Sequence, residues 1–221
     1  TSAMKMVAAA KLRKAQEQAI ASRPYCINME KIVSNLSQKL TANAPLLLTG
    51  KAEIKKQLLV VFSADRGLCG GFNTSITRSV KNEILQATKN NIETKLLLIG
   101  RKSADSLKRD FGDYFLEIVT GNSANPAFND SLLITSKIIN FFENDEFGTC
   151  KIVFNKFVSA ISQVVTFKHL IPVANDEKED LTSISNSIYE YEPTEEEILD
   201  ELLNRNITTQ LFSAQMESSA S

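Results

Sequence analysis

An uninterrupted helical pattern over residues 2–42 constrains the fold of this chain more than any other feature. The stretch lacks glycine and is rich in Ala, Lys, Gln and Met, a composition that favours helix formation. It predicts one helix of about 40 residues, roughly 60 Å long. Pro24 removes one backbone hydrogen bond, so we expect a kink near it.

Small or apolar residues recur along this stretch at alternating spacings of four and three, which is typical of a coiled-coil seam. The seam positions are Ala8, Leu12, Ala15, Ala19, Ser22, Cys26, Met29, Val33, Leu36 and Leu40. The first half of the seam is mostly alanine, so the backbone of a partner helix can approach closely there. We therefore expect the helix to pack lengthwise against another.

A second long helical pattern closes the chain. Thr194–Glu197 follows Pro193 and matches a capping box, which marks a helix N-terminus. The apolar face of this helix consists of Leu199, Leu203, Ile207, Leu211 and Ala214. No N-cap precedes the first helix and no Gly or Pro stop follows the second, so we expect both to be cut off at their outer ends.

Between the long helices, apolar runs typical of strands alternate with helical stretches. The expected strands are 58–62, 96–99, 115–119, 151–158 and 163–171, the expected helices are 74–90, 101–110 and 127–143, and residues 43–56 are expected to be a loop. This alternation predicts an α/β fold with a mostly parallel, doubly wound sheet. The last run alternates polar and apolar residues, as an edge or antiparallel strand does.

The chain divides into four parts with unequal charge. We expect an N-terminal helix (1–43), an α/β domain (44–173), a polar connector (174–193) and a C-terminal helix (194–221). The first part holds seven Lys or Arg against two Glu, about +5, whereas residues 176–201 hold eleven Asp or Glu against one Lys, about −10. These two regions should therefore meet different surroundings.

The composition argues against several classes of protein. No run approaches the roughly 18 consecutive apolar residues of a membrane-spanning helix. Three cysteines without a CxxC pair build no disulfide framework, and a single histidine makes a structural zinc site unexpected. The basic first helix carries one aromatic residue, Tyr25, so an acidic protein partner is favoured over nucleic acid or a membrane surface.

The segment Asp65–Asn73 (DRGLCGGFN) lies between an expected strand and an expected helix, where phosphate-binding loops are found. It lacks the GK[ST] of a Walker motif and does not match GxGxxG. We therefore interpret it as a glycine-rich turn that lets the backbone pack tightly, with nucleotide binding as the alternative.

The same loop suggests a hydrolase as a further alternative. Gly67–Gly71 is a cysteine version of the GxSxG nucleophile elbow, with Cys69 as the nucleophile. Asp110 or Asp130, and then His169, follow in the correct chain order for its partners. However, Cys69 lies seven residues past the preceding strand and His169 falls within an alternating strand. We therefore favour a mechanical or interaction protein over an enzyme.

Five segments, in order along the whole chain, together resemble the gamma subunit of F-type ATP synthase. They are Ala3–Leu12 (AMKMVAAAKL), Asp65–Asn73 (DRGLCGGFN), Phe154–Phe157 (FNKF), Tyr189–Pro193 (YEYEP) and Ile198–Leu203 (ILDELL). The first two are the most specific. Chains of this family extend beyond both ends of this one, so the resemblance implies that the tip of the shaft is missing here.

The resemblance implies a Rossmann-like domain inserted between two long helices that form an antiparallel coiled coil, the central stalk of a rotary motor. In this family the shaft turns inside the ring of alpha and beta subunits, and the α/β domain is the foot on the c-ring, beside the epsilon subunit. Proton-driven rotation then changes the conformations of the beta catalytic sites. The resemblance therefore implies a non-catalytic subunit without metal or cofactor, and no nucleotide site at Asp65–Asn73.

The resemblance also assigns contact residues by position. Those facing the alpha and beta subunits, whose levers are acidic in this family, would be Met4, Lys5, Lys11 and Arg13. Those in the foot, near the c-ring and the epsilon subunit, would be Tyr191 and Glu192. The implied location is the cytoplasmic face of a bacterial inner membrane, reached through the complex, with the matrix face of the mitochondrial inner membrane as the second choice.

Overall fold

The computed structural model describes residues 2–39, 44–67, 69–121, 126–159, 162–173 and 195–221. Its helices are α1 (Ser2–Lys39), α2 (Leu46–Thr49), α3 (Phe72–Lys89), α4 (Arg101–Phe111), the 3-10 helix η1 (Gly112–Tyr114), α5 (Phe128–Glu143) and α6 (Glu195–Ala220). Its strands are β1 (Lys56–Phe62), β2 (Glu93–Ile99), β3 (Phe115–Val119), β4 (Thr149–Ser159) and β5 (Ser162–Ile171). The predicted strands and longer helices are all present, with bounds that differ by a few residues.

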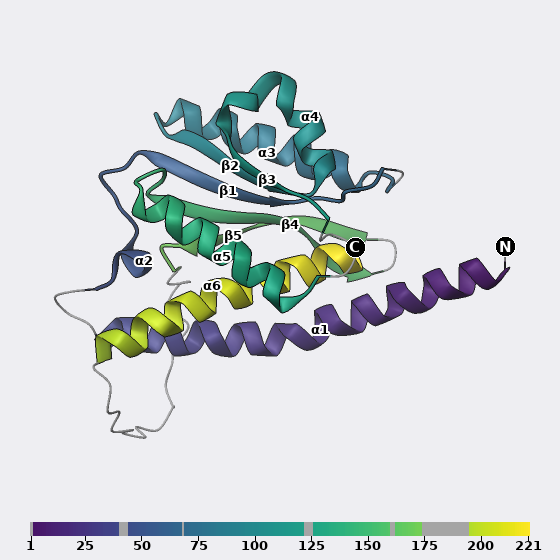
Figure 1. Ribbon diagram of the computed structural model, residues 1–221, viewed down its shortest axis with the longest axis horizontal. Helices are drawn as coiled ribbons and strands as arrows, with labels where there is room; N and C mark the ends of the chain where they lie inside the picture. The colour runs from purple at the N-terminus through teal and green to yellow at the C-terminus, as the bar shows by residue number, and fades with distance from the viewer. Residues whose placement is uncertain (1, 40–43, 68, 122–125, 160–161, 174–194) are drawn as a thin grey trace.

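The strands form one sheet in the order β3-β2-β1-β4-β5. The first four run parallel, and β5 pairs antiparallel to β4 at the edge. Helices α3 and α4 cover one face of the sheet, and α5 and α6 cover the other (Figure 1). The predicted doubly wound α/β fold and the antiparallel edge strand are therefore confirmed.

Side chains alternate between the two faces along β1, as the period of a strand requires. Leu59 and Val61 pack under α3 and α4, whereas Leu58, Val60 and Phe62 pack under α5 and α6. All five are almost fully buried. Because both faces of β1 are covered, its sequence is a continuous apolar run rather than an alternating one.

Helix α1 lies antiparallel to α6 and extends well beyond its end (Figure 1). The predicted seam is buried or half-buried from Ala15 to Leu36, where α6 lies against it, but Ala8 and Leu12 are exposed. Leu40, the last predicted seam position, lies outside the described residues. Pro24 sits inside the continuous helix. The seam pattern therefore predicts the partner helix correctly from Ala15 to Leu36, and its antiparallel direction is the one that the resemblance implied.

Two features of the helices differ from the sequence interpretation. The expected loop 43–56 contains the short helix α2, which begins after Pro45 and ends at Gly50. Helix α6 buries the five predicted apolar positions, but it also buries many polar residues because α1, α5 and the sheet surround it. The predicted capping box cannot be compared with the structure, which describes neither Thr194 nor the side chains of residues 195–197. None of the described helices is long and apolar enough to cross a membrane.

Candidate functional site

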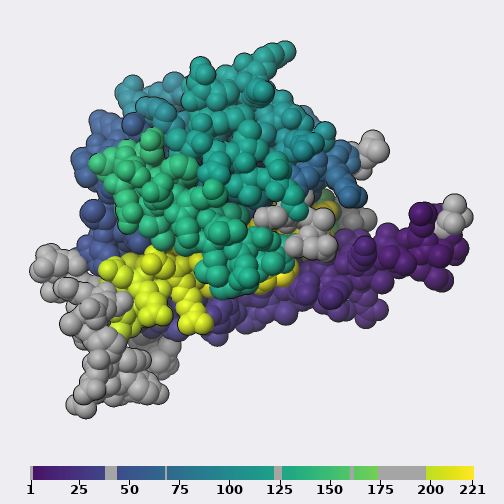
Figure 2. All heavy atoms as spheres, viewed as in Figure 1, coloured from purple at the N-terminus to yellow at the C-terminus, as the bar shows by residue number. Residues whose placement is uncertain are grey.

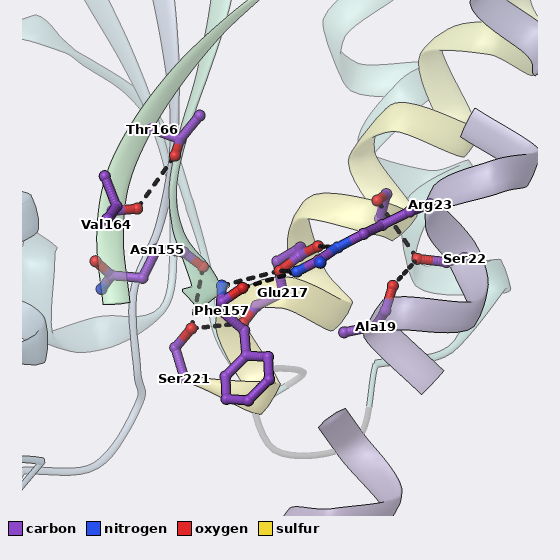
Figure 3. Close-up of polar contacts among 10 residues, drawn as sticks. Ala19, Ser22, Arg23, Asn155, Phe157, Val164, Thr166, Glu217 and Ser221 are labelled. Atoms are coloured by element: carbon purple, nitrogen blue, oxygen red, sulfur yellow. Dashed lines mark hydrogen bonds and ion pairs between the residues drawn. The ribbon is translucent and has the colours of Figure 1, made fainter. Parts of the chain in front are cut away.

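The long helices are joined to the sheet by a buried ion pair. Arg23 of α1 donates from Nε to Glu217 Oε1 at 2.6 Å and from Nη2 to Glu217 Oε2 at 2.9 Å. The Phe157 N–H of β4 donates to Glu217 Oε2 at 2.9 Å, and the Phe157 carbonyl accepts from Arg23 Nη2 at 2.7 Å. We call these three residues the Glu217 joint; Figure 3 shows them converging from α1, α6 and β4.

The Glu217 joint lies along the part of β4 that extends past the end of β1 and has no neighbouring strand on that side. Pairing of β4 with β1 ends at Val153, opposite Val61, whereas β4 continues to Ser159. Buried backbone groups without a partner are strongly unfavourable, and strand edges are where they arise. The Glu217 carboxylate and the Arg23 guanidinium take both polar groups of Phe157, so they stand in for the missing strand. Ser221 continues the pattern by donating from Oγ to the Asn155 carbonyl at 3.2 Å.

The geometry of the ion pair makes it strong. Two of the three guanidinium nitrogens, Nε and Nη2, each donate to one carboxylate oxygen, the bidentate arrangement that gives charged hydrogen bonds direction as well as strength. The Glu217 side chain is 4% exposed and that of Arg23 is 33% exposed, so Glu217 is the more costly group to leave without its partner. The hydrogen bond to Glu217 raises the pKa of Arg23, which keeps it charged. The joint therefore keeps its cation at any ordinary pH.

Apolar side chains close around the ion pair. Phe157 packs in one cluster with Ala19 of α1 and with Met216 and Ala220 of α6. Ala19 is fully buried, so the alanine seam does bring the two helix backbones together at this level. The cluster helps to keep water away from the Glu217 carboxylate, which strengthens its attraction to Arg23.

A second polar contact ties the edge strand to the same two helices. Lys168 of β5 forms an ion pair with Glu30 of α1, and its Nζ donates to Gln210 Oε1 of α6 at 2.6 Å. Gln210 in turn donates from Nε2 to the Cys26 carbonyl of α1 at 3.4 Å. We call Glu30, Lys168 and Gln210 the Lys168 joint. The two joints fix the α1–α6 pair to β4 and β5 at two separate levels.

The sequence interpretation missed both joints, although one signal was present. Glu217 follows Ala214 by three positions, so it occupies the next place on the apolar face of α6. A carboxylate at such a place needs a buried partner. The sequence did not mark Arg23 in the same way. It lies next to the seam position Ser22, where an arginine is expected to be on the surface.

The glycine-rich loop after β1 is held by side chains rather than by close backbone packing. Asp65 accepts hydrogen bonds from the backbone N–H of Arg101 and of Gly121, at 3.1 and 3.0 Å. A Cβ added to Gly70 or Gly71 would meet nothing within 4 Å. The prediction that these glycines allow tight packing is therefore wrong. Gly70 instead supplies a backbone with φ +55°, which favours glycine.

The hydrolase alternative is not supported by the arrangement of its residues. Cys69 lies in the loop beyond the carboxyl end of β1, whereas His169 pairs through Lys151 with the middle of that strand. Asp110 ends α4 on one face of the sheet, with its pKa lowered by hydrogen bonds from Lys81 and Arg109.

The other candidate acid lies on the opposite face. Asp130 accepts a hydrogen bond from the Ala127 N–H at the start of α5.

The other two cysteines are core residues. Burial raises the thiol pKa of Cys26 and of Cys150, which leaves both unreactive. The described residues contain no group of three His, Cys, Asp or Glu that could hold a metal ion.

The predicted partner-contact residues of α1 lie on the part that extends beyond α6. All four, Met4, Lys5, Lys11 and Arg13, are exposed, and Arg13 pairs with Glu17 on the surface. Figure 2 shows this end of α1 standing clear of the rest of the molecule. Tyr191 and Glu192 lie outside the described residues. The geometry is a sheet rigidly joined to a long projecting helix.

Comparisons with known proteins agree on one family. A family model described as ATP synthase matches residues 1–221. The ATP synthase gamma chain of Pelagibacter ubique is 43% identical over 224 residues, which cover all of this chain and 76% of that protein. The ATP synthase gamma chain of Rhodospirillum rubrum is 42% identical over 230 residues, which cover 100% of this chain and 77% of that protein.

Solved structures show the same likeness. The central stalk and c-ring structure of Tetrahymena thermophila mitochondrial ATP synthase contains a chain that is 25% identical, with a TM-score of 0.72, covering 99% of this chain and 92% of that one. A chain of the rotor of Euglena gracilis mitochondrial ATP synthase is 15% identical with a TM-score of 0.54. The match covers 96% of this chain and 86% of that one. The second likeness shows the fold alone.

Proposed function

This chain belongs to the family of ATP synthase gamma chains, and on that premise we propose how it carries torque. It is a gamma subunit, the central stalk of the rotary complex, and it is associated with the membrane through that complex. It is non-catalytic, since catalysis lies in the beta subunits. What remains to be explained is how rotation passes from one part of the chain to the other.

Torque enters through the sheet and leaves through the α1–α6 pair, across the Glu217 and Lys168 joints. The observation that carries this proposal is the bidentate Arg23–Glu217 pair closed on the Phe157 backbone. Apolar contacts between a helix and a sheet have no preferred direction, so they resist sliding less than directed hydrogen bonds do. Hydrogen bonds to a fixed strand backbone resist both sliding and rotation. Rotation of the sheet is thereby passed to the helices.

The partners follow from the family and from its solved members. The Tetrahymena relative is a central stalk solved with a c-ring, and a Euglena relative comes from an assembly of F1 and a c-ring. For this chain the alpha and beta subunits surround the α1–α6 pair, and the epsilon subunit and the c-ring meet the sheet domain. The finer location is the cytoplasmic face of a bacterial inner membrane, with the mitochondrial matrix face as the second choice.

The projecting end of α1 is the part that meets the alpha and beta subunits. Its basic residues Lys5, Lys11 and Arg13 are exposed and suit an acidic partner, and Met4 is 79% exposed. Tyr191 and Glu192 are the proposed contacts to the c-ring and the epsilon subunit. By contacting each beta subunit differently as it turns, the helix pair biases their conformational equilibria.

The torque path is tested in ATP synthase reconstituted into vesicles with this gamma chain. Glu217→Ala should leave ATP hydrolysis largely intact and reduce the protons pumped per ATP severalfold, because the helices then turn without holding the sheet. Lys81→Ala, which removes an exposed ion pair on the other face, is the matched control and should pump normally. A Glu217→Ala complex that assembles and pumps like wild type rules out the proposed path.

The partner proposal has a separate test. Purified alpha and beta subunits are mixed with the chain, and the assembled hexamer is measured. Replacing Lys5, Lys11 and Arg13 together with Gln should weaken assembly, and more strongly at low salt, where charge attraction is greatest. Unchanged assembly at every salt concentration contradicts the assigned contacts.

A further inference from the structure

A buried lysine lies outside both joints. The Lys51 side chain is 10% exposed, although lysines are rarely buried unless their charge is paired. Its Nζ donates to the Phe142 carbonyl at 2.6 Å and to Asp145 Oδ1 at 2.5 Å, and it lies 4.5 Å from the centroid of the Phe142 ring. Phe142 belongs to the last turn of α5, where a helix favours positive charge. The ammonium group therefore fixes the Lys51 side chain to the end of α5.

The backbone at Lys51 packs closely on the turn before β4. The Lys51 N–H donates to the Gly148 carbonyl at 3.0 Å. A Cβ added to Gly148 would lie 2.3 Å from the Lys51 carbonyl oxygen and 2.6 Å from that of Ile54, so only glycine allows this approach. Backbone and side chain thus both hold residues 51–54 against the sheet domain.

Helix α2, which comes just before Lys51 in the chain, contacts the helix pair instead. Leu48 of α2 is 8% exposed and packs with Val33 of α1 and with Leu199 and Leu203 of α6. The buried residues of this cluster come from α1, α2 and α6, so the cluster joins the helix pair to α2. Figure 1 shows α2 near the end of the molecule where α6 begins. A helix of only four residues is not stable by itself, so the position of α2 depends on the residues around it.

Three contacts follow one another along α6 at intervals of seven residues. Leu203 packs on α2, Gln210 belongs to the Lys168 joint, and Glu217 forms the other joint. Seven residues make almost two helical turns, so Leu203 lies roughly 20 Å from Glu217 along the helix axis. The two joints hold the second half of α6 by directed hydrogen bonds. The first turns of α6 pack on α2, and the directed contacts nearest to α2 are those of Lys51.

We propose that Lys51 is a positioning residue for torque transfer, and that residues 44–54 form a third connection between the sheet and the helix pair. We call residues 44–54 the brace. This inference rests on the torque path proposed above. A helix pair that is held only near Glu217 bends away from the sheet at its other end under load, whereas a pair held at both ends turns with the sheet. Lys51 provides the directed contact at that other end, because its ammonium group sets the position of the brace on α5.

The role of Lys51 in coupling is tested in ATP synthase reconstituted into vesicles with this gamma chain. Lys51→Met keeps an unbranched side chain of similar length but removes the charge and its hydrogen bonds. It should roughly halve the protons pumped per ATP, a smaller loss than that expected for Glu217→Ala, because the two distant joints remain. Lys151→Met is the matched control and should pump normally, because Lys151 is 22% exposed and pairs with Glu83 of α3 at 2.7 Å, on the face away from the helix pair.

Hydrogen exchange of the isolated chain then locates the effect. In Lys51→Met the amides of residues 46–54 and 198–204 should exchange about tenfold faster than in wild type, as the loss of a charged hydrogen bond predicts for a local opening. The amides around Glu217 should exchange as in wild type. Faster exchange by the same factor throughout the chain would mean that Lys51 contributes only to overall stability, and it overturns the inference.

Three further results also overturn it. They are normal pumping by an assembled Lys51→Met complex, an equal loss of pumping in Lys151→Met, and unchanged exchange in the brace. If Glu217→Ala lowers the protons pumped per ATP while Lys51→Met does not, the torque path stands with its two joints and the brace carries no torque. If both variants pump normally, the torque path itself is wrong.

Discussion

The two faces of the sheet are held to their helices in different ways. On the α3–α4 face the contact is an apolar cluster in which Val80 and Ile84 pack on Leu59 and Val61. On the α6 face a similar apolar cluster is joined by buried polar residues of the helix, which are Asn206, Thr208, Thr209, Gln210, Gln215 and Glu217. The first face is mainly apolar, with a few directed contacts such as the Lys151–Glu83 ion pair at 2.7 Å, whereas the second adds six buried polar residues of a single helix to its core.

The difference matches what each face has to do. Apolar packing is non-directional and tolerates substitution, so it specifies the position of a helix along its own axis less strictly than directed hydrogen bonds do. Buried ion pairs add little net stability compared with apolar replacements, but breaking one is strongly unfavourable. The α3–α4 face needs only to complete the domain. In the proposed torque path the α6 face also keeps the helix pair in one orientation while the stalk turns, through the contacts of Glu217 and Lys168 with the strands.

The largest expected effect comes from breaking the buried ion pair. Arg23→Ala leaves the Glu217 carboxylate buried without its cation, and should lower the free energy of unfolding by about 3 kcal/mol. The matched change on the other face, Lys81→Ala, removes a pair whose side chains are about one-third exposed and should cost at most about 1 kcal/mol. Urea unfolding of both variants measures the difference. Equal losses would contradict the contrast between the faces.

Apolar truncation should not distinguish the two faces. Ile84 of α3 and Ile207 of α6 are each 1% exposed and belong to the two sheet clusters. Ile84→Val and Ile207→Val should each cost about 1 kcal/mol, because each removes one buried methylene. Thermal unfolding gives both values under the same conditions. A much larger loss for Ile207→Val would mean that the apolar part of the α6 face also holds the helix in place.

Removing a polar atom from α6 should stabilise the chain. Thr209 is 2% exposed and its Oγ1 has no hydrogen-bond partner in the described structure. Thr209→Val keeps the shape and removes the desolvated hydroxyl, so it should raise the free energy of unfolding by about 1 kcal/mol. Ser103→Ala is the comparison, since Ser103 is also buried but is hydrogen-bonded to Ser63 at 2.8 Å. It should destabilise the chain, and a stabilising Ser103→Ala would contradict this account.

The smallest effect is a pH dependence on the α3–α4 face. Hydrogen bonds from Lys81 and Arg109 lower the pKa of Asp110 in the folded chain. The stabilisation is therefore present above the unfolded pKa, about 4, and is lost as the pH falls through the lower folded value. Asp110→Asn should be slightly less stable than wild type at neutral pH, and the gap should close in acid. Urea titrations at several pH values test this sign.

Much of the fold could be predicted because it depends on local periodicity. The run at 58–62 and the helix at 74–90 follow from residue type and spacing over a few positions, and both were predicted within two or three residues. The predicted seam is confirmed where α6 covers it, at Ala19, Cys26 and Val33. The short helix α2 was missed, since four residues after a proline give no periodic signal.

The candidate site was largely hidden from the sequence. Arg23, Phe157 and Glu217 are at least 60 residues apart along the chain, and no local pattern connects them. The prediction of tight backbone packing at Gly70 and Gly71 was wrong, because a glycine-rich sequence is equally compatible with a loop that has open space around it. Cys69 and His169 matched the order of a catalytic triad, but chain order says nothing about which end of a sheet a residue reaches.

The sequence by itself determined the parts of this protein: two long helices, the alternation of strands and helices between them, and the family motifs of a rotary stalk. The tertiary structure decided how those parts are joined. Because β4 continues past the end of β1, it leaves backbone groups unpaired, and the lengths of two strands distant in sequence set where that happens. Arg23 and Glu217 meet at that place because unpaired backbone and unpaired charge are both costly when buried. The proposed torque path runs through this contact because it satisfies both at once.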